Sequence, residues 1–155
     1  DATLTVVGTG PQEAEVRKLL DSSGQPTINF KGRCSPEEMP HIYRSHDVLV
    51  CPYENEPWGL TINEAMSCGL AVIASFNGTC GAALDLLQNE RNGIGIDQVR
   101  EETLTLAMGR LLDQAEFVQA MKKNSLKIIS CWTYCTATQA MLTATLRATR
   151  PATND

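Results

Sequence analysis

Short apolar runs rich in β-branched residues alternate along this chain with helix-like patterns and glycine-marked turns. Parallel strands need long crossover connections between them, and those crossovers are usually helices. The alternation is therefore typical of a parallel sheet with helices packed on both of its faces. We predict a doubly wound α/β fold.

The boundaries of the expected elements follow from turn residues, helix caps and the spacing of apolar side chains. We predict strands at residues 4–7, 27–30, 47–51, 71–74 and 93–96. We predict helices at residues 11–22, 36–44, 60–68, 81–88, 101–113, 115–129 and 133–148. The chain shows no internal repeat or low-complexity linker, so we predict one domain over residues 1–150 and a disordered tail at 151–155.

Length, composition and charge exclude several classes of protein. With 155 residues, 43% of them apolar, the chain is long enough to bury a core without metals or disulfides. A net charge of −5 argues against a nucleic-acid partner, because such partners are bound by basic surfaces. No apolar run reaches the roughly 18 residues of a membrane-spanning helix, and the N-terminus has no leader. We expect a soluble protein or a piece of one, since the first residue is not Met.

The six cysteines and two histidines show no pattern of a metal or redox site. No two cysteines form a Cys-x-x-Cys pair, and Cys51, Cys68 and Cys80 lie in or beside apolar stretches, where a free cysteine behaves as a small buried hydrophobe. His41 and His46 flank a predicted helix end without a partner at ligand spacing. We therefore predict buried cysteines, surface or helix-capping histidines, and no bound metal or cofactor.

Two strand-to-helix turns could receive a ligand, because ligands of open parallel sheets bind beyond the carboxyl ends of the strands. The first turn contains Gly8 and Gly10, which allow close approach to the backbone. Glu13 stands where a dinucleotide fingerprint has its third glycine, so the nicotinamide interpretation is weakened. A phosphate contact and a purely structural tight turn both remain open at this position.

The second turn precedes the third predicted helix and is the most informative segment of the sequence. Gly59 allows a sharp turn, so the N–H groups of Gly59, Leu60 and Thr61 can point at an anion along the helix dipole. Glu56 lies in the loop before them, and we place Glu64 in the first helical turn. Carboxylates accept hydrogen bonds from hydroxyls, so the pattern indicates a diphosphate seat flanked by groups that suit a sugar or ribose.

The two acids stand in an E-x7-E arrangement inside the segments EPWGL (56–60) and EAMSCGLAVIAS (64–75). This pattern resembles the nucleotide-sugar-binding domain of the group 1 (family 4) retaining glycosyltransferases. The long acidic motif is specific, and shorter likenesses extend the resemblance over about four fifths of the chain. They are VVGTGP (6–11), FKGR (30–33), IYRSHDV (42–48), NGIGID (92–97) and LLD (111–113).

The resemblance implies the donor half of a GT-B fold, a Rossmann-like domain that faces a second Rossmann-like half across a cleft. It implies that Glu64 binds the ribose hydroxyls and that Glu56 binds the transferred sugar. It also implies that the amides of Gly59, Leu60 and Thr61 bind the diphosphate or the adjoining sugar.

The same resemblance implies that Gly8 and Gly10 border the phosphate side of the cleft, and that Gly32, Arg33 and Cys34 lie against the base. The implied reaction keeps the anomeric configuration through a same-face displacement in which the leaving phosphate is stabilised. Within it Glu56 is the candidate catalytic residue, as a hydrogen-bond acceptor at the reacting sugar rather than as a nucleophile.

Two features depart from the family's pattern. The segment FNGTCG (76–81) replaces a paired-glycine loop that usually lies near the donor phosphates. The family's donor half also begins with a strand and helix that carry an Arg and a Lys for the diphosphate, and this chain starts after them. Between Cys51 and Met66 there are three Glu and no Lys or Arg, and a helix end offers only about +0.5 charge. We expect a cation from outside the chain.

We interpret the chain as the donor-binding part of a retaining hexosyltransferase that uses a nucleotide-diphosphate sugar. It lacks an N-terminal acceptor-binding domain and is expected to be inactive alone, because two substrates must be held between closing domains. Two alternatives remain: half of a nucleotide-sugar epimerase or phosphorylase on the same fold, and a non-catalytic binding or scaffold domain. The resemblance also implies a cytoplasmic location, with contact to a membrane face through the absent half.

Overall fold

The structure is a computed structural model that describes residues 2–25 and 27–149. The chain divides into two compact units, residues 1–46 and 47–155, and each is described by itself. The tail predicted at 151–155 lies outside the described residues. The prediction of one domain over residues 1–150 stays a prediction.

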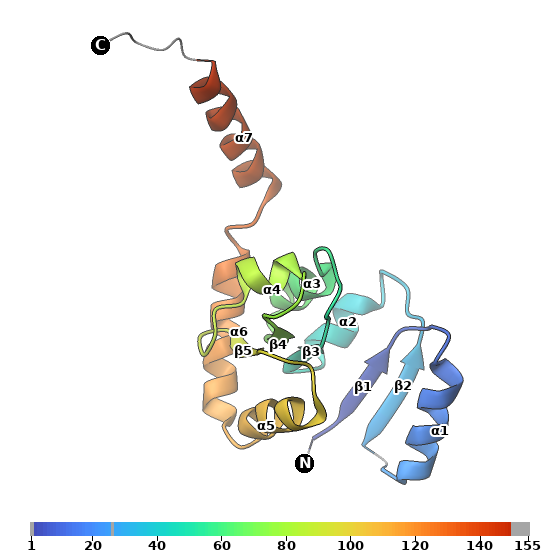
Figure 1. The fold of residues 1–155 in the computed structure, drawn as a ribbon. Helices are drawn as coiled ribbons and strands as arrows, with labels where there is room; N and C mark the ends of the chain where they lie inside the picture. The colour runs from blue at the N-terminus through green and yellow to red at the C-terminus, as the bar shows by residue number, and fades with distance from the viewer. Residues whose placement is uncertain (1, 26, 150–155) are drawn as a thin grey trace. The chain divides into compact units, whose positions relative to one another are not determined.

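Unit 1 consists of a two-stranded parallel sheet and two helices (Figure 1). Its elements are β1 (Leu4–Val7), α1 (Glu13–Ser23), β2 (Ile28–Gly32) and α2 (Met39–Arg44). The register between β1 and β2 is irregular at Val6 and Val7, so that Val7 lies opposite Gly32. Helix α1 ends at Gly24, which adopts a left-handed conformation with φ +61°. A glycine suits that position because its backbone carries no Cβ penalty there.

The prediction that Ser35 caps α2 is wrong, because this helix begins at Met39 with Glu38 as its N-cap, although Ser35 and Glu38 do form reciprocal hydrogen bonds. The Ser35 amide donates to Glu38 Oε2 at 2.7 Å, and the Glu38 amide donates to Ser35 Oγ at 3.3 Å. The Ser35 bonds lower the pKa of the Glu38 carboxyl, with a smaller contribution from Lys31. The bonds close a tight turn over residues 35–38, so the regular helix starts only at Met39.

Unit 2 carries a three-stranded parallel sheet and five helices. Its strands are β3 (Val48–Cys51), β4 (Ala71–Ser75) and β5 (Gly93–Ile96), which pair in the order β3-β4-β5. Its helices are α3 (Leu60–Ser67), α4 (Gly81–Leu86), α5 (Glu101–Leu112), α6 (Ala115–Ile129) and α7 (Tyr134–Ala148). The predicted α/β class is confirmed, with the described strands hydrogen-bonded in two separate sheets.

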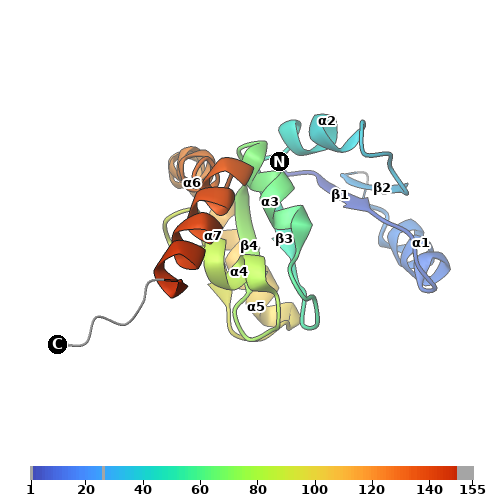
Figure 2. The ribbon, with the colours of Figure 1, turned by 90° about the horizontal axis from the view of Figure 1, so that it is seen from above.

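Strand β4 is the centre of the unit 2 core, and all five of its residues are buried. Val72 and Ala74 face a cluster formed with α3 and α4, whereas Ala71 and Ile73 face a cluster formed with α5 and α6. Figure 1 shows α3 and α4 on one side of these strands and α5 on the other, and Figure 2 gives the same unit from above. Alternate side chains of one strand therefore hold both helical layers.

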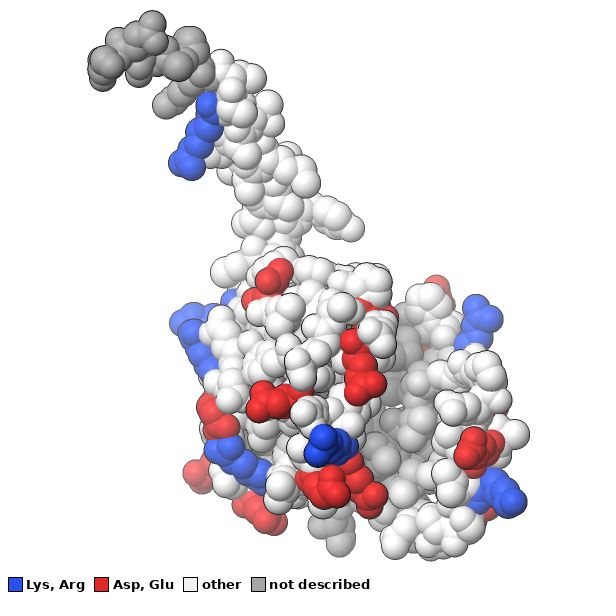
Figure 3. All heavy atoms as spheres, in the orientation of Figure 1, with Lys and Arg blue, Asp and Glu red and all other residues white. Residues whose placement is uncertain are grey.

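Helix α7 contributes to neither core cluster. Every residue from Tyr134 to Ala148 is exposed except Thr143, which is half-buried. Arg147 is the one charged residue of this helix, and the surface of α7 in Figure 3 is otherwise uncharged. Neither α7 nor any other helix within the described ranges is long and apolar enough to span a bilayer.

Two glycines of unit 2 provide a matched test of the sheet packing. A Cβ on Gly93 of β5 would lie 1.9 Å from the carbonyl oxygen of Val72, whereas a Cβ on Gly109 of α5 would meet no atom within 4 Å. We expect Gly93→Ala to lower the free energy of unfolding by about 1–3 kcal/mol or more. Gly109→Ala should raise it by about 0.5–1 kcal/mol, since alanine favours a helix. Urea unfolding followed by circular dichroism measures both, and equal effects would contradict the packing of β5 on β4.

Candidate functional site

The turn that connects β3 to α3 is built around a left-handed glycine. Gly59 has φ +90° and ψ 59° and directly precedes the first residue of α3, Leu60. A Cβ at Gly59 would lie 2.6 Å from Cys80 Sγ, so both the conformation and the space favour glycine. The turn forms where the sequence predicted it, with the N-terminus of α3 beyond the carboxyl end of β3.

Glu64 lies further along α3 than predicted. Because the left-handed Gly59 caps the helix, Leu60 is its first residue and Glu64 its fifth. The first turn of α3 contains no acidic residue, so the placement of Glu64 in that turn is wrong. Glu64 is exposed on the second turn. Its carboxylate therefore gains little from the helix dipole, which acts mainly within the first turn.

Glu56 is held by the main chain of the turn that it precedes. Its Oε1 accepts hydrogen bonds from the Gly59 amide at 3.2 Å and from the Trp58 amide at 3.4 Å. These two bonds fix the position of the carboxylate relative to the turn. The Gly59 amide, which the sequence suggested for an anion, is thus already engaged by an internal carboxylate.

Thr61 faces back toward the end of β3. Its Oγ1 lies 3.4 Å from the hydroxyl of Tyr53 and 3.6 Å from Cys51 Sγ. Burial raises the pKa of the Cys51 thiol to about 11, against smaller opposing effects of its Thr61 and Tyr53 contacts. Burial likewise raises the pKa of Tyr53. Both groups are therefore neutral near pH 7 and act as hydrogen-bonding contacts that orient Thr61.

A second segment, residues 79–82, forms hydrogen bonds to the acidic loop, residues 52–59. The Thr79 amide donates to the Glu54 carbonyl at 3.3 Å, and the Ala82 amide donates to the Trp58 carbonyl at 2.8 Å. Cys80 Sγ lies 3.0 Å from the same Trp58 carbonyl. Backbone hydrogen bonds from this segment thus reach the loop on both sides of Glu56.

The segment 76–81, which departs from the family's paired-glycine pattern, still uses its glycines for close packing. A Cβ on Gly78 would lie 2.9 Å from the carbonyl oxygens of Tyr53 and Glu54. A Cβ on Gly81 would lie 2.7 Å from the ring of Trp58. Sequence reasoning left the role of this segment open. Its small residues after β4 are the signal that could have indicated a close backbone approach.

Trp58 connects the turn to a distant part of unit 2. Its indole Nε1 donates to Asn63 Oδ1 at 2.8 Å, which ties the turn to α3. Its ring lies 5.8 Å, centroid to centroid, from the ring of Trp132, which follows α6. No local sequence pattern indicated this contact.

The predicted donor-binding residues of unit 1 gather at the carboxyl ends of β1 and β2. The Gly8 amide donates to the Gly32 carbonyl at 2.8 Å, and both glycines have positive φ, +136° and +69°. Gly10 and Arg33 are exposed, and Cys34 is half-buried. Each unit thus presents its own share of the predicted residues at the carboxyl ends of parallel strands.

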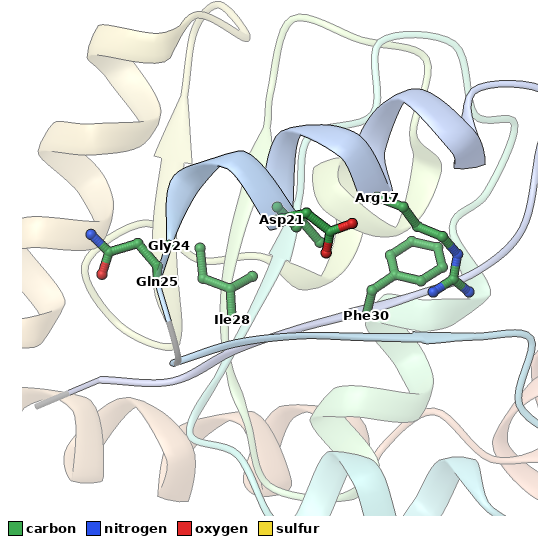
Figure 4. A pocket seen from close by; sticks show the side chains of 7 residues that line it. Arg17, Asp21, Gly24, Gln25, Ile28 and Phe30 are labelled. Atoms are coloured by element: carbon green, nitrogen blue, oxygen red, sulfur yellow. The ribbon is translucent and has the colours of Figure 1, made fainter.

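The cavity found in unit 1 does not include these residues. It has a volume of about 380 Å³ and lies between α1 and β2 (Figure 4). Arg17 stacks on the Phe30 ring, 4.2 Å from its centroid, and also pairs with Glu13. The guanidinium of Arg17 therefore already has partners in Phe30 and Glu13. The cavity is lined by Arg17, Leu20, Asp21, Gly24, Gln25, Ile28 and Phe30.

The cysteines and histidines show no metal site in the part of the chain that the structure describes. All six cysteines are free; Cys51 and Cys80 are buried as predicted, whereas Cys68 is only half-buried. The imidazole of His46 lies 2.7 Å from the Ile42 carbonyl at the end of α2 and 2.9 Å from Thr5 Oγ1, which fits the predicted capping role. Among the described residues, no group of three or more His, Cys, Asp or Glu could hold a metal ion.

The structure thus shows a parallel α/β fold with candidate ligand-binding residues at the carboxyl ends of its strands. The profile of the family described as Glycosyl transferases group 1 matches residues 1–128. The chain belongs to the group 1 glycosyltransferases.

Two relatives illustrate the likeness in sequence. The sulfoquinovosyl transferase of Arabidopsis thaliana is 34% identical over 93 residues, which cover 60% of this chain and 17% of that protein. A GDP-mannose-dependent alpha-mannosyltransferase of Corynebacterium glutamicum is 31% identical over 116 residues, covering 74% of this chain and 26% of that one. The chain spans about a quarter of these relatives or less.

Two solved structures share the fold. The Anabaena protein HepE in complex with UDP-glucose matches with a TM-score of 0.75 and 22% identity, over 94% of this chain and 41% of HepE. Sucrose-phosphate synthase of Thermosynechococcus elongatus matches with a TM-score of 0.74 and 26% identity, over 96% of this chain and 39% of the synthase. The predicted GT-B relationship is confirmed at the level of fold.

The environment of the cysteines predicts their reactivity. With a pKa of about 11 and a buried sulfur, Cys51 should react with iodoacetamide near pH 8 about 100-fold more slowly than an exposed thiol, since only thiolates react. The exposed Cys131 and Cys135 should react first. Peptide mass spectrometry over time measures each site, and unfolding in urea should remove the difference. Fast labelling of Cys51 in the folded protein would contradict the packing around Thr61.

Proposed function

We propose that this chain is the donor-binding domain of a retaining glycosyltransferase of family 4, which transfers a sugar from a nucleotide-diphosphate sugar. The observation that carries the proposal is the turn before α3, in which Glu56 accepts from the amide of the left-handed Gly59. Its E-x7-E partner Glu64 lies on the second turn of the helix that this turn starts. Family membership supports transferase chemistry. The UDP-glucose complex of HepE supports a sugar nucleotide as the donor.

In this proposal the diphosphate or the adjoining sugar binds at the amides of Leu60 and Thr61, which stand at the positive end of α3. Gly59 completes that end, with its amide shared between the ligand and Glu56. Glu64 accepts hydrogen bonds from the ribose hydroxyls, one helical turn further along. Gly8 and Gly10 border the phosphates, and Gly32, Arg33 and Cys34 lie against the base.

Glu56 acts as a positioned acceptor for a hydroxyl of the transferred sugar. Two main-chain amides already donate to its Oε1, and charge-assisted bonds of this kind reduce the nucleophilicity of a carboxylate. This supports a mechanism without a covalent intermediate on Glu56. The bond from the anomeric carbon to the diphosphate breaks, and a bond to the acceptor oxygen forms on the same face. The acceptor's proton passes to the departing phosphate.

The charge of the turn requires help from outside this sequence. The loop and first turns carry Glu54, Glu56 and Glu64 against a helix end worth about +0.5 charge. A diphosphate needs cations, and we propose that an Arg and a Lys come from a further strand and helix of the full-length protein. An N-terminal acceptor-binding domain completes the cleft, and contact with the cytoplasmic face of a membrane belongs to that part.

Strand β3 supports this proposal. Within the described sheet β3 pairs only with β4. Val48 and Val50 nevertheless pack toward one core cluster and Leu49 toward the other. A charge-free strand with apolar contacts on both faces is typical of the interior of a parallel sheet, whereas edge strands are usually guarded by charges or proline. One further parallel strand beside β3 would give it that environment.

The role of Glu64 can be tested by UDP binding. Glu64→Ala removes a negative charge, which by itself would strengthen the binding of an anion. We expect instead a roughly 10-fold or greater loss of affinity, because a hydrogen bond to a charged group contributes about 1.5–3 kcal/mol. Isothermal titration calorimetry with UDP and GDP measures this change in affinity.

The matched control for this test is Glu102→Ala, which removes an exposed acid from the first turn of α5. It should leave UDP binding unchanged. The loss at Glu64 should also disappear with 2′,3′-dideoxyuridine diphosphate, which lacks the ribose hydroxyls. Equal effects of the two substitutions, or a loss that persists with the dideoxy ligand, would contradict the ribose role.

The incomplete cleft leads to a second expectation. The 155-residue chain should bind UDP or GDP weakly but should neither hydrolyse UDP-glucose or GDP-mannose nor transfer the sugar to an added acceptor extract, because closing domains are needed to exclude water and align both substrates. Radiolabelled donors measure both reactions. Sustained sugar transfer by this chain alone would contradict the need for a second domain.

A further inference from the structure

A polar cavity lies at the carboxyl ends of all three strands of unit 2. Its volume is about 470 Å³, within the range of small-molecule sites. Glu54 and Asn55 line it from the loop after β3, Asn77 from the segment after β4, and Asp97 and Arg100 from the segment after β5. In open parallel sheets this edge is where ligands bind.

The asparagines of this cavity differ from the others in the same unit. Asn63, Asn89, Asn92 and Asn124 each use the side-chain amide in a hydrogen bond within the chain. Between residues 47 and 149, the exposed side chains of Asn55 and Asn77 make no hydrogen bond within the chain, and only the main-chain amide of Asn77 does.

Within the part of the chain that the structure describes, the acids of the cavity are exposed and have no ion pair, as is also true of the exposed Asp113 elsewhere in unit 2. Asp47 pairs with Lys122 and Glu90 pairs with Arg110. The ion pairs and hydrogen bonds of the described residues involve neither the Asp97 nor the Glu54 carboxylate. The cavity thus collects unpaired donors and acceptors from three separate loops.

Main-chain contacts hold these loops in position. The Phe76 amide donates to the Ile96 carbonyl at 3.0 Å, which joins the segments after β4 and β5. The Thr79 amide donates to the Glu54 carbonyl, which joins the segments after β3 and β4. At the floor, the hydroxyl of Ser75, which is 3% exposed, accepts from the Asn77 amide at 3.2 Å. The main chain of the walls is therefore preorganised, although the polar side chains that it carries are exposed.

The chemistry of the lining selects the ligand. Two carboxylates and one guanidinium give a formal charge of −1, so a phosphate is disfavoured. Carboxylates accept hydrogen bonds from hydroxyls. Amide N–H and guanidinium groups donate hydrogen bonds to hydroxyl oxygens and so help to orient the ligand. We infer that this cavity binds a neutral, hydroxyl-rich ligand, a sugar unit, at a site separate from the amide turn before α3. Asp97 and Asn77 are its central contacts.

The test uses the 155-residue chain and four neutral probes: glucose, mannose, galactose and myo-inositol. We expect saturable binding of at least one probe in the millimolar range, with chemical-shift changes at the side-chain amides of Asn55 and Asn77. Asp97→Asn and Asn77→Ala should each weaken that binding at least about 5-fold. Asp113→Asn, which makes the same change at an exposed acid after α5, should not.

Binding of UDP separates this site from the proposed donor site. Glu64→Ala should weaken UDP binding and leave sugar binding intact, while Asp97→Asn should do the opposite. The inference is overturned by an absence of saturable binding for all four probes, by equal affinities of the Asp97→Asn and Asp113→Asn proteins, or by inorganic phosphate binding here in place of a sugar. Circular dichroism shows whether each variant is folded. If the Asp97→Asn protein is unfolded, the sugar binding of the Asn77→Ala protein decides the result.

Discussion

Burial of β4 on both faces is the constraint on which the rest of unit 2 depends. All five of its residues are buried, so apolar helix faces must cover each side of the strand. Val72 and Ala74 hold α3 and α4, and Ala71 and Ile73 hold α5 and α6. Because β3, β4 and β5 run parallel, the loops that follow them emerge at one edge. Every candidate ligand-binding residue of unit 2 is placed there by this arrangement.

The turn before α3, at that edge, is held by several main-chain hydrogen bonds and is not an isolated loop. Gly59 in a left-handed conformation starts α3, and Glu56 accepts from the two amides around it. The segment 79–82 then binds the loop from the side of β4 through amide donors. A carboxylate that is fixed in this way offers a directed acceptor, which suits recognition of a sugar hydroxyl better than covalent attack.

Electrostatics divides the carboxyl edge into two kinds of surface. The amides at the start of α3 favour an anion, although the acids around them make outside cations necessary. The cavity formed by Asn55, Asn77 and Asp97 carries a small negative charge and many hydrogen-bonding groups, which favours a neutral partner. A nucleotide diphosphate and a sugar unit could therefore occupy neighbouring parts of one protein without competing for the same contacts.

The sequence by itself determined the elements, the family and the turn. β5 and α6 have the predicted bounds. Gly93 marks the start of β5, and the spacing of apolar side chains marks α6. The E-x7-E pattern identifies Glu56 and Glu64 because it is a spacing along the chain. Glu64 lies in the second turn of α3 and not in the first, because the helix starts at Leu60 as predicted and Glu64 is its fifth residue. Only the tertiary structure decided that Glu56 binds the Gly59 amide, that residues 79–82 support the loop, and that Trp132 reaches Trp58. Packing brings the residues of these contacts together in space, and no local periodicity of the sequence predicts which residues will meet.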